Sequence, residues 1–177
     1  MSNPNYRLII YDEKRIVLIN NETRKLYIYN TGDKDNYFRF LSQEAEGIQF
    51  SNDGKKLLYW TKWEIFVYFT RDWDVQPIRS ENELRNITRF SEELKNVQWS
   101  KDYEHIIFTT GEEIKIIEAD YRDRCNLLNI IKLNSTASYV IADFSQSKLY
   151  FTDTRDGNSY LYFIDFPEKT GFLGIGG

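Results

Sequence analysis

The fold of this chain is decided by the stretch Ile48-Gln49-Phe50-Ser51-Asn52-Asp53-Gly54-Lys55-Lys56-Leu57-Leu58-Tyr59, in which an aromatic residue precedes Ser-x-Asp-Gly-Lys and an apolar run. The pattern returns in Val97-Gln98-Trp99-Ser100-Lys101-Asp102-Tyr103-Glu104-His105-Ile106-Ile107-Phe108 and in Ala142-Asp143-Phe144-Ser145-Gln146-Ser147-Lys148-Leu149-Tyr150-Phe151. A degenerate first copy reads Ile10-Tyr11-Asp12-Glu13-Lys14-Arg15-Ile16-Val17-Leu18. The chain is therefore built from four copies of one structural unit.

Each copy divides into short apolar segments separated by turn residues. Asn52-Asp53-Gly54, Gly111-Glu112 and Asp156-Gly157 suit tight hairpins, because Asn, Asp and Gly tolerate a positive φ. Repeats of about 40–45 residues with several short strands each are typical of propeller blades. We predict an all-β fold, a β-propeller of four four-stranded antiparallel blades, as one domain over 1–177 with blades at roughly 6–45, 47–90, 96–133 and 139–175.

The apolar segments and the turns between them predict the strands of every copy. The first copy has strands at Tyr6–Tyr11, Arg15–Asn20, Lys25–Tyr29 and Tyr37–Leu41. The second has strands at Gly47–Ser51, Lys56–Thr61, Glu64–Phe69 and Asn86–Phe90. The third has strands at Asn96–Ser100, His105–Thr110, Glu113–Glu118 and Asn126–Leu133. The fourth has strands at Tyr139–Phe144, Lys148–Thr152 and Tyr160–Phe166, and the glycine-rich tail Thr170–Gly177 either supplies a last strand or is mobile.

The third strand of every copy is an almost continuous apolar run, and the first positions of these runs differ by 39, 49 and 47 residues. The runs are Leu26–Tyr29, Ile65–Tyr68, Ile114–Ile117 and Leu161–Ile164. Such runs indicate strands that are buried on both faces, as in blades packed between other blades. The longest departure from the repeat, Arg71–Arg85, is charged and polar, and we predict a loop or hairpin extension there.

The aromatic-Ser-x-Asp-Gly-Lys pattern resembles the TolB-type and WD-like β-propeller repeat. Residues 50–58 carry it best, whereas Tyr103 replaces the glycine in the third copy and Gln146-Ser147 replaces Asp-Gly in the fourth. The segment from Trp63 to Trp99 also resembles the propeller part of bacterial PEGA-domain proteins, although no PEGA segment is present. The resemblance covers nearly the whole chain and implies an interaction platform, which is an inference from fold alone.

Composition excludes several classes of function. The net charge is −4 and the sequence pI about 5.2, so no broad basic face for nucleic acid is expected. Cys125 is the one cysteine, which rules out an intrachain disulfide and favours a reducing compartment such as the cytoplasm. Neither a signal peptide nor an apolar run near the ~18 residues of a membrane helix is recognisable. We expect a soluble chain that is not inserted in a membrane.

Few residues suggest catalysis or metal binding. His105 is the only histidine and lacks a motif that supplies an orienting partner and a nucleophile, so we interpret it as an ordinary residue at the start of a strand. Cys125 follows two nearby arginines that could activate it, but we interpret it as a small apolar filler.

No cofactor or metal is expected. The acidic turns have no EF-hand spacing, and the glycine-rich tail has no lysine that would make it a phosphate loop. The turn residues concerned are Asp33, Asp35, Asn36, Asp153, Arg155 and Asp156. The best ligand-binding candidates are aromatic, namely Trp60, Trp63 and Trp73, which belong to a cluster with Tyr59 and Tyr68. These rings either fill layers between blades or form a contact surface, and Trp73 is expected to be the most exposed.

Closure of the ring leaves three alternatives. Four blades can close alone, or the sequence is a fragment of a longer chain, or two chains form an eight-bladed ring as a homodimer that covers the apolar end faces. We favour the homodimer. The predicted function is a non-enzymatic scaffold that presents loops to a protein partner. The alternative is a carbohydrate- or small-ligand-binding propeller, and a third hypothesis is an accessory domain of a hydrolase.

Overall fold

The computed structural model describes residues 5–31, 36–119, 126–136 and 139–166, and within these ranges every regular element is a β-strand. The strands of the first two blades are β1 (Tyr6–Asp12), β2 (Arg15–Asn20), β3 (Leu26–Thr31), β4 (Asn36–Ser42), β5 (Gly47–Phe50), β6 (Lys56–Trp60), β7 (Glu64–Phe69) and β8 (Leu84–Arg89). The others are β9 (Leu94–Trp99), β10 (His105–Thr110), β11 (Glu113–Glu118), β12 (Leu127–Lys132), β13 (Val140–Asp143), β14 (Lys148–Arg155) and β15 (Asn158–Asp165).

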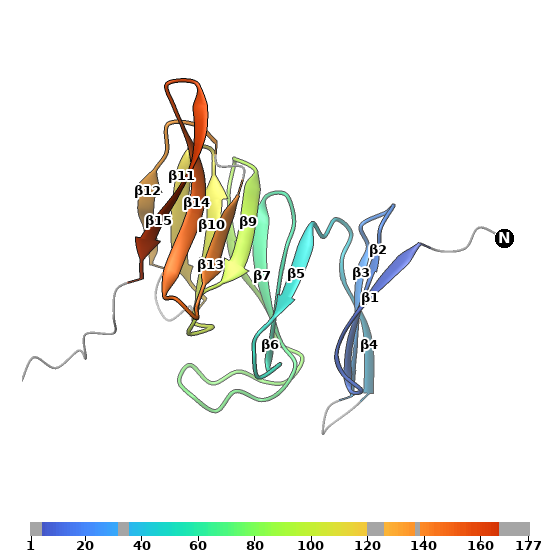
Figure 1. The fold of residues 1–177 in the computed structure, drawn as a ribbon. Coiled ribbons are helices and arrows are strands. Elements are labelled where there is room, and N and C mark those ends of the chain that lie inside the picture. The colour runs from blue at the N-terminus through green and yellow to red at the C-terminus, as the bar shows by residue number, and fades with distance from the viewer. Residues whose placement is uncertain (1–4, 32–35, 120–125, 137–138, 167–177) are drawn as a thin grey trace, which may run out of the picture.

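The strands form four antiparallel sheets in which each strand pairs with its neighbour in sequence (Figure 1). Three sheets have four strands, β1–β4, β5–β8 and β9–β12, and the fourth has three, β13–β15. This confirms the prediction of an all-β chain of four antiparallel units. The last strand that we expected from the tail lies outside the described residues.

The repeated motif builds the turn between the first two strands of a blade. In the second blade the Ser51 hydroxyl donates to Asp53 Oδ1 at 2.7 Å and accepts from the backbone N of Lys56 at 2.9 Å. Gly54 has a φ of 64°, which is accessible to glycine at little cost. Tyr103 replaces it in the third blade and keeps a φ of 53°, so the turn geometry is retained although the glycine is not.

The core lies in three layers between successive blades. The layer between the first and second blades contains Val17, Ile19, Leu26, Ile28, Leu57, Tyr59 and Tyr68. The layer between the second and third blades contains Leu58, Ile65, Val67, Val97, Trp99, Ile106 and Phe108, and the last contains Ile107, Ile114, Val140, Leu149 and Phe151. Alternate side chains of β6 and β10 enter opposite layers, so the second and third blades are buried on both faces.

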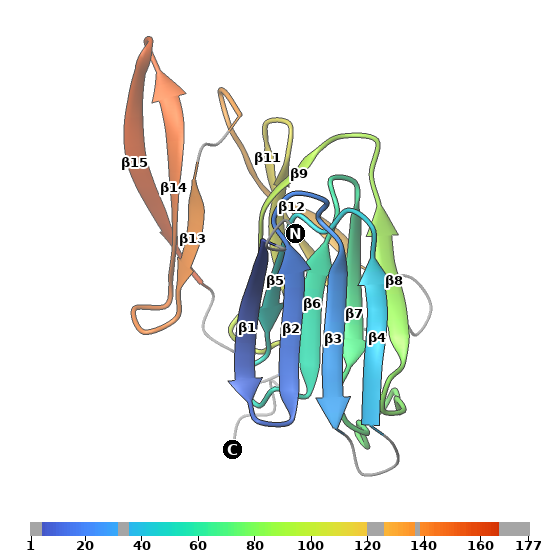
Figure 2. The same cartoon turned by 90° about the vertical axis from the view of Figure 1, so that its right-hand side faces the viewer.

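The end blades depart from that expectation. Leu161 and Phe163 of β15 are 69% and 54% exposed, and Tyr29 of β3 is 36% exposed. The prediction that all four third strands are buried on both faces is therefore wrong for the first and fourth blades. The physical reason is that these two sheets lie at opposite ends of the row and each has a neighbouring blade on one face only, so the described residues form an open arc (Figures 1 and 2).

The segment Arg71–Arg85 is an extension with one bridge between Trp73 and Arg79, whose backbones exchange two hydrogen bonds of 2.9 Å. Its end begins β8 at Leu84, two residues before the predicted start at Asn86. No helix among the described residues meets the length and apolarity needed to cross a membrane.

Candidate functional site

The outer face of the first blade is a continuous apolar surface, which we call the N-terminal end face. Strand register places two apolar side chains of each strand on it, namely Leu8, Ile10, Ile16, Leu18, Tyr27, Tyr29, Phe38 and Phe40. Tyr27 stacks on Phe38 with ring centroids 5.5 Å apart, and Phe40 meets the same tyrosine edge-on at 5.4 Å. Ile10 and Phe38 remain 63% and 62% exposed. Patches of this kind mark interaction sites on soluble proteins.

The outer face of the fourth blade is the corresponding C-terminal end face. Its register aligns Ile141, Tyr150 and Phe163 in one row. Ile141 is 60% exposed, and Leu161 in the next row is 69% exposed. An ion pair of 2.7 Å between Lys148 and Asp165 borders the face, with the ammonium 3.9 Å from the centroid of the Phe163 ring. Both ends of the arc therefore present apolar side chains. The two faces are formed by different strands, and the Lys148–Asp165 ion pair lies beside the C-terminal end face.

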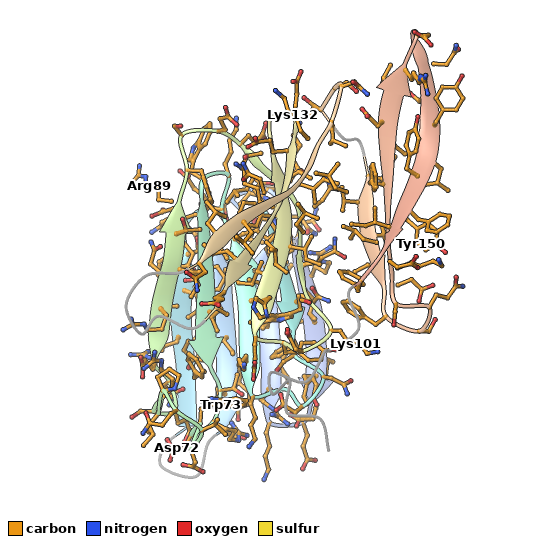
Figure 3. All side chains as sticks on the ribbon, turned by 90° about the vertical axis from the view of Figure 1, so that its left-hand side faces the viewer. Asp72, Trp73, Arg89, Lys101, Lys132 and Tyr150 are labelled. Carbon is orange, nitrogen blue, oxygen red and sulfur yellow. The ribbon has the colours of Figure 1, made fainter. Side chains whose placement is uncertain are left out.

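A cavity of about 610 Å³ lies between the second and third blades. One wall comes from β7 and the extension that follows it, and the other from the ends of β10 and β11. Figure 3 shows Asp72, Trp73 and Lys101 at the same end of the sheets, opposite the end that carries Arg89 and Lys132. The lining residues are Lys56, Val67, Phe69, Trp73, Val75, Gln76, Pro77, Arg79, Glu104, His105, Glu118, Ala119 and Asn126.

Two lining residues have unusual surroundings. Lys56 is only 6% exposed, its ammonium donates to the backbone O of Tyr103 at 2.6 Å, and the same ammonium lies 4.2 Å from the Trp73 ring centroid. His105 Nδ1 lies 2.8 Å from Asp102 Oδ2, and this hydrogen bond raises the pKa of the imidazole against the opposing effect of burial. Burial disfavours the charged form of Asp102, but hydrogen bonds from His105 and from the backbone N of Glu104 outweigh it and lower its pKa to about 2.

The interpretation of His105 thus needs one correction, because Asp102 three residues earlier orients the imidazole. This partner could have been found in the sequence, since Asp102 directly precedes the strand in the repeated turn. Within the described residues no serine, threonine or cysteine hydrogen-bonds the imidazole. The contact therefore belongs to the turn, where Asp102 Oδ1 also accepts from the backbone N of Glu104 and His105 at 3.0 and 3.1 Å.

The three tryptophan candidates are not brought together. Trp60 is half-buried against the core, Trp63 is 36% exposed, and Trp73 is half-buried over Lys56. The expectation that Trp73 is the most exposed is wrong, because its ring covers the Lys56 ammonium and packs on the core. Trp63 lies next to Arg89 in a shallow hollow, and Figure 3 places Arg89 and Trp73 at opposite ends of the sheets.

The remaining candidates lie partly outside the described residues. Cys125, Asp33 and Asp35 lie outside the described residues, as does the side chain of Asn36. The Asp153 carboxylate accepts hydrogen bonds from the backbone N and side-chain amide of Asn134, and the φ angles of 52° and 79° at Asp156 and Gly157 are those of a tight turn. Among the described residues no group of three or more His, Cys, Asp or Glu is placed to hold a metal ion.

Comparisons with known proteins locate the fold. A structural genomics protein of unknown function from Bacteroides thetaiotaomicron superposes with a TM-score of 0.57 at 12% identity, over 91% of this chain and 42% of the other. TolB from Acinetobacter baumannii superposes with a TM-score of 0.54 at 16% identity, over 86% of this chain and 38% of the other. The fold is that of a TolB-type β-propeller.

This fold confirms the predicted resemblance to TolB-type repeats. The WD40 domain of SCAP from fission yeast also aligns, with a TM-score of 0.44 and 10% identity over 93% of this chain and 43% of the other. The described propeller spans about two fifths of the chains to which it is similar, 42% and 38% for the first two. No family model and no curated protein matches the sequence. The resemblance to PEGA-domain proteins stays a prediction.

Proposed function

We propose that this protein is a non-enzymatic β-propeller scaffold that completes its ring by self-association through the end blades and presents loops to a protein partner. The observation that carries the proposal is the pair of exposed apolar end faces. All four blades act as one domain over 1–177 in this proposal. The likeness to propellers more than twice as long supports it, because an arc of about two fifths of such a chain leaves room for a second arc.

The contact is expected to run head to tail. Within the chain, the face of each blade that points toward the C-terminal end of the row packs on the face of the next blade that points toward the N-terminal end. Continuing this order places the C-terminal end face of one copy on the N-terminal end face of the other. Two such contacts close a ring of two copies, whereas a rotation that failed to close would give a filament.

The energetics favour the closed ring. Completing the burial of a half-exposed Ile, Leu or Phe contributes about 1 kcal/mol, since full burial contributes ~1.5–3 kcal/mol. Each contact covers several such side chains, among them Leu8, Ile10, Phe38, Ile141, Leu161 and Phe163. Ring closure forms two contacts between the copies. The loss of translational and rotational freedom, which costs ~4–15 kcal/mol, occurs only once because two molecules associate. Closure therefore stabilises the assembly more than a single contact does.

The test is the absolute mass of the purified chain, measured by light scattering on a sizing column over a range of concentrations. We expect twice 21.2 kDa for the unaltered chain and a monomer for Ile10→Glu and for Phe163→Glu, because a buried unpaired carboxylate opposes the contact. Ile78→Glu is the matched control, since Ile78 is 60% exposed but belongs to the extension. A monomer at every concentration overturns self-association.

No catalytic role is proposed. The Asp102 carboxylate orients His105, but no described residue near His105 supplies a nucleophile. Nucleophilic catalysis by a histidine base requires both an orienting group and a nucleophile. The carbohydrate alternative is also weaker, because Trp73 lines the large cavity whereas Trp63 lines a separate hollow with Arg89. Figure 3 shows Arg89 and Trp73 at opposite ends of the sheets.

A further inference from the structure

The cavity between the second and third blades has the size of a ligand site. Its volume of about 610 Å³ falls within the ~300–1,000 Å³ typical of such sites. It opens where the extension of the second blade, the longest departure from the repeat, faces the third blade. This extension is not part of the repeated motif, so it gives the second blade a feature of its own at the end of the sheets where the cavity opens.

One wall of the cavity is apolar. Val67 and Phe69 of β7 form part of it and belong to the buried core. Trp73, Val75 and Pro77 of the extension add further apolar surface. Val75 is 62% exposed although it lines the cavity, so an aliphatic side chain entering from solvent would cover it.

The facing wall is acidic. Glu118 ends β11 directly opposite His105, and both of its carboxylate oxygens accept from the side-chain amide of Asn126 at 3.1 Å. Glu104 is exposed and also lines the cavity. Glu104 directly precedes His105 in the chain, Glu118 pairs with His105 across β10 and β11, and all three residues line the cavity.

Lys56 and Arg79, the lysine and the arginine among the described lining residues, are both engaged by the fold. Lys56 is held by the Tyr103 carbonyl and the Trp73 ring. Arg79 lies 3.7 Å from a Glu83 carboxylate oxygen and donates to the backbone O of Ile78 at 3.1 Å. Among the described lining residues, Glu104 and Glu118 therefore offer negative charge to a ligand beside an apolar wall.

We propose that this cavity binds an extended peptide segment of a partner protein, with an aliphatic side chain against Val75 and Trp73 and an adjacent Lys or Arg against Glu104 and Glu118. The neighbouring apolar and acidic walls match two neighbouring side chains, and a charge-assisted hydrogen bond to a carboxylate suits a basic group. This site would supply the loops that the proposed scaffold presents to its protein partner, so the inference rests on the proposed scaffold function. The site lies within one chain and does not require ring closure.

The experiment uses an array of synthetic Gly-Ser peptides in which two adjacent positions sample every amino acid, probed with the full chain. We expect binding to concentrate on peptides that pair Leu, Ile or Val with Arg or Lys. The best peptide is then labelled with fluorescein and titrated by anisotropy. Its Kd should rise about tenfold in Glu104→Gln and in Glu118→Gln, and the affinity should fall with added salt, because partly exposed charges are screened.

Two matched controls keep the result specific. Val75→Ser should weaken binding several-fold while Ile78→Ser, on the same extension at similar exposure but outside the cavity lining, should leave it unchanged. Glu13→Gln, an exposed carboxylate on the first blade, should also leave it unchanged. An array without apolar–basic preference, or equal effects in test and control variants, overturns the proposal. Light scattering on the same samples shows separately whether self-association holds.

Discussion

Tyr103 of the third blade accepts a hydrogen bond of 2.6 Å at its backbone oxygen from the buried ammonium of Lys56 in the second blade. The tyrosine holds a φ of 53° at a position where the second blade has Gly54, and its ring meets Trp99 edge-on at 6.2 Å. Tyr103 therefore combines a strained backbone conformation with an aromatic contact to Trp99 and a hydrogen bond between the second and third blades.

Replacing Tyr103 separates backbone strain from packing. Tyr103→Gly should change the free energy of unfolding little, because relief of the positive φ, about 1 kcal/mol, offsets the lost ring contact. Tyr103→Ala keeps the strain and loses the ring, so we expect destabilisation by about 1–2 kcal/mol. Urea denaturation of both variants measures the difference, and equal destabilisation would contradict the role given to the backbone.

Asn30 joins the first blade to the extension. It is fully buried, its amide donates to the Thr70 carbonyl and to Asn82 Oδ1 at 3.0 Å each, and its Oδ1 accepts from Arg71 at 2.7 Å. Asn30→Leu leaves these groups without their partner, and we expect destabilisation by about 2–4 kcal/mol. Asn21→Leu, which removes an exposed amide contact, should cost under about 0.5 kcal/mol. Similar losses in both variants in thermal unfolding would contradict this.

The Asp102–His105 contact makes stability depend on pH. The raised pKa of His105 contributes stability below the ordinary value near 6.5, and this is lost as pH rises through the raised pKa. The lowered pKa of Asp102 contributes stability above 3.8, lost as pH falls toward about 2. The difference in unfolding free energy between the parent and Asp102→Asn should therefore be largest between these limits, near pH 4–6.5.

For a partly exposed imidazole we expect that difference to be about 1 kcal/mol. NMR titration of the single histidine measures the shift directly, and Asp102→Asn should bring its pKa down toward the ordinary value. An unchanged histidine titration in the variant would show that Asp102 does not act on the imidazole in solution.

Gly47 is required by the ring of Trp60. A Cβ at this position would overlap the half-buried ring of Trp60, whereas a Cβ at Gly157 would meet nothing within 4 Å. Gly47→Ala should destabilise by about 2–4 kcal/mol through overpacking, and Gly157→Ala by only about 1 kcal/mol through its positive φ. Denaturant midpoints of the two variants provide the comparison, and the reverse order would be inconsistent with the packing described.

Strands inside a blade could be predicted well because their turns are local. The bounds of β10 and β11 are as predicted, since Gly111-Glu112 fixes the hairpin between them. The burial of Leu161 and Phe163 was not predicted correctly. An apolar run indicates that a strand packs against a partner, but it does not indicate whether that partner belongs to the same chain.

The cavity was missed for a different reason. Its walls come from segments that are distant in sequence, around Trp73–Arg79 and around Glu104 and Glu118, and no periodicity connects them. Trp73 stood out in the sequence as an aromatic residue in a polar insertion, but its contact with Lys56 depends on how the second and third blades pack.

Within the described residues, the extension at Arg71–Arg85 belongs to the second blade and has no counterpart on the other three. A ring of two copies would therefore be bivalent, with the two extensions related by the two-fold axis and held at a fixed separation. A partner that carries two recognition segments joined by a linker matched to that separation would bind with avidity well above the affinity of either segment, and an interrupted ring would lose this gain without any change in the single site.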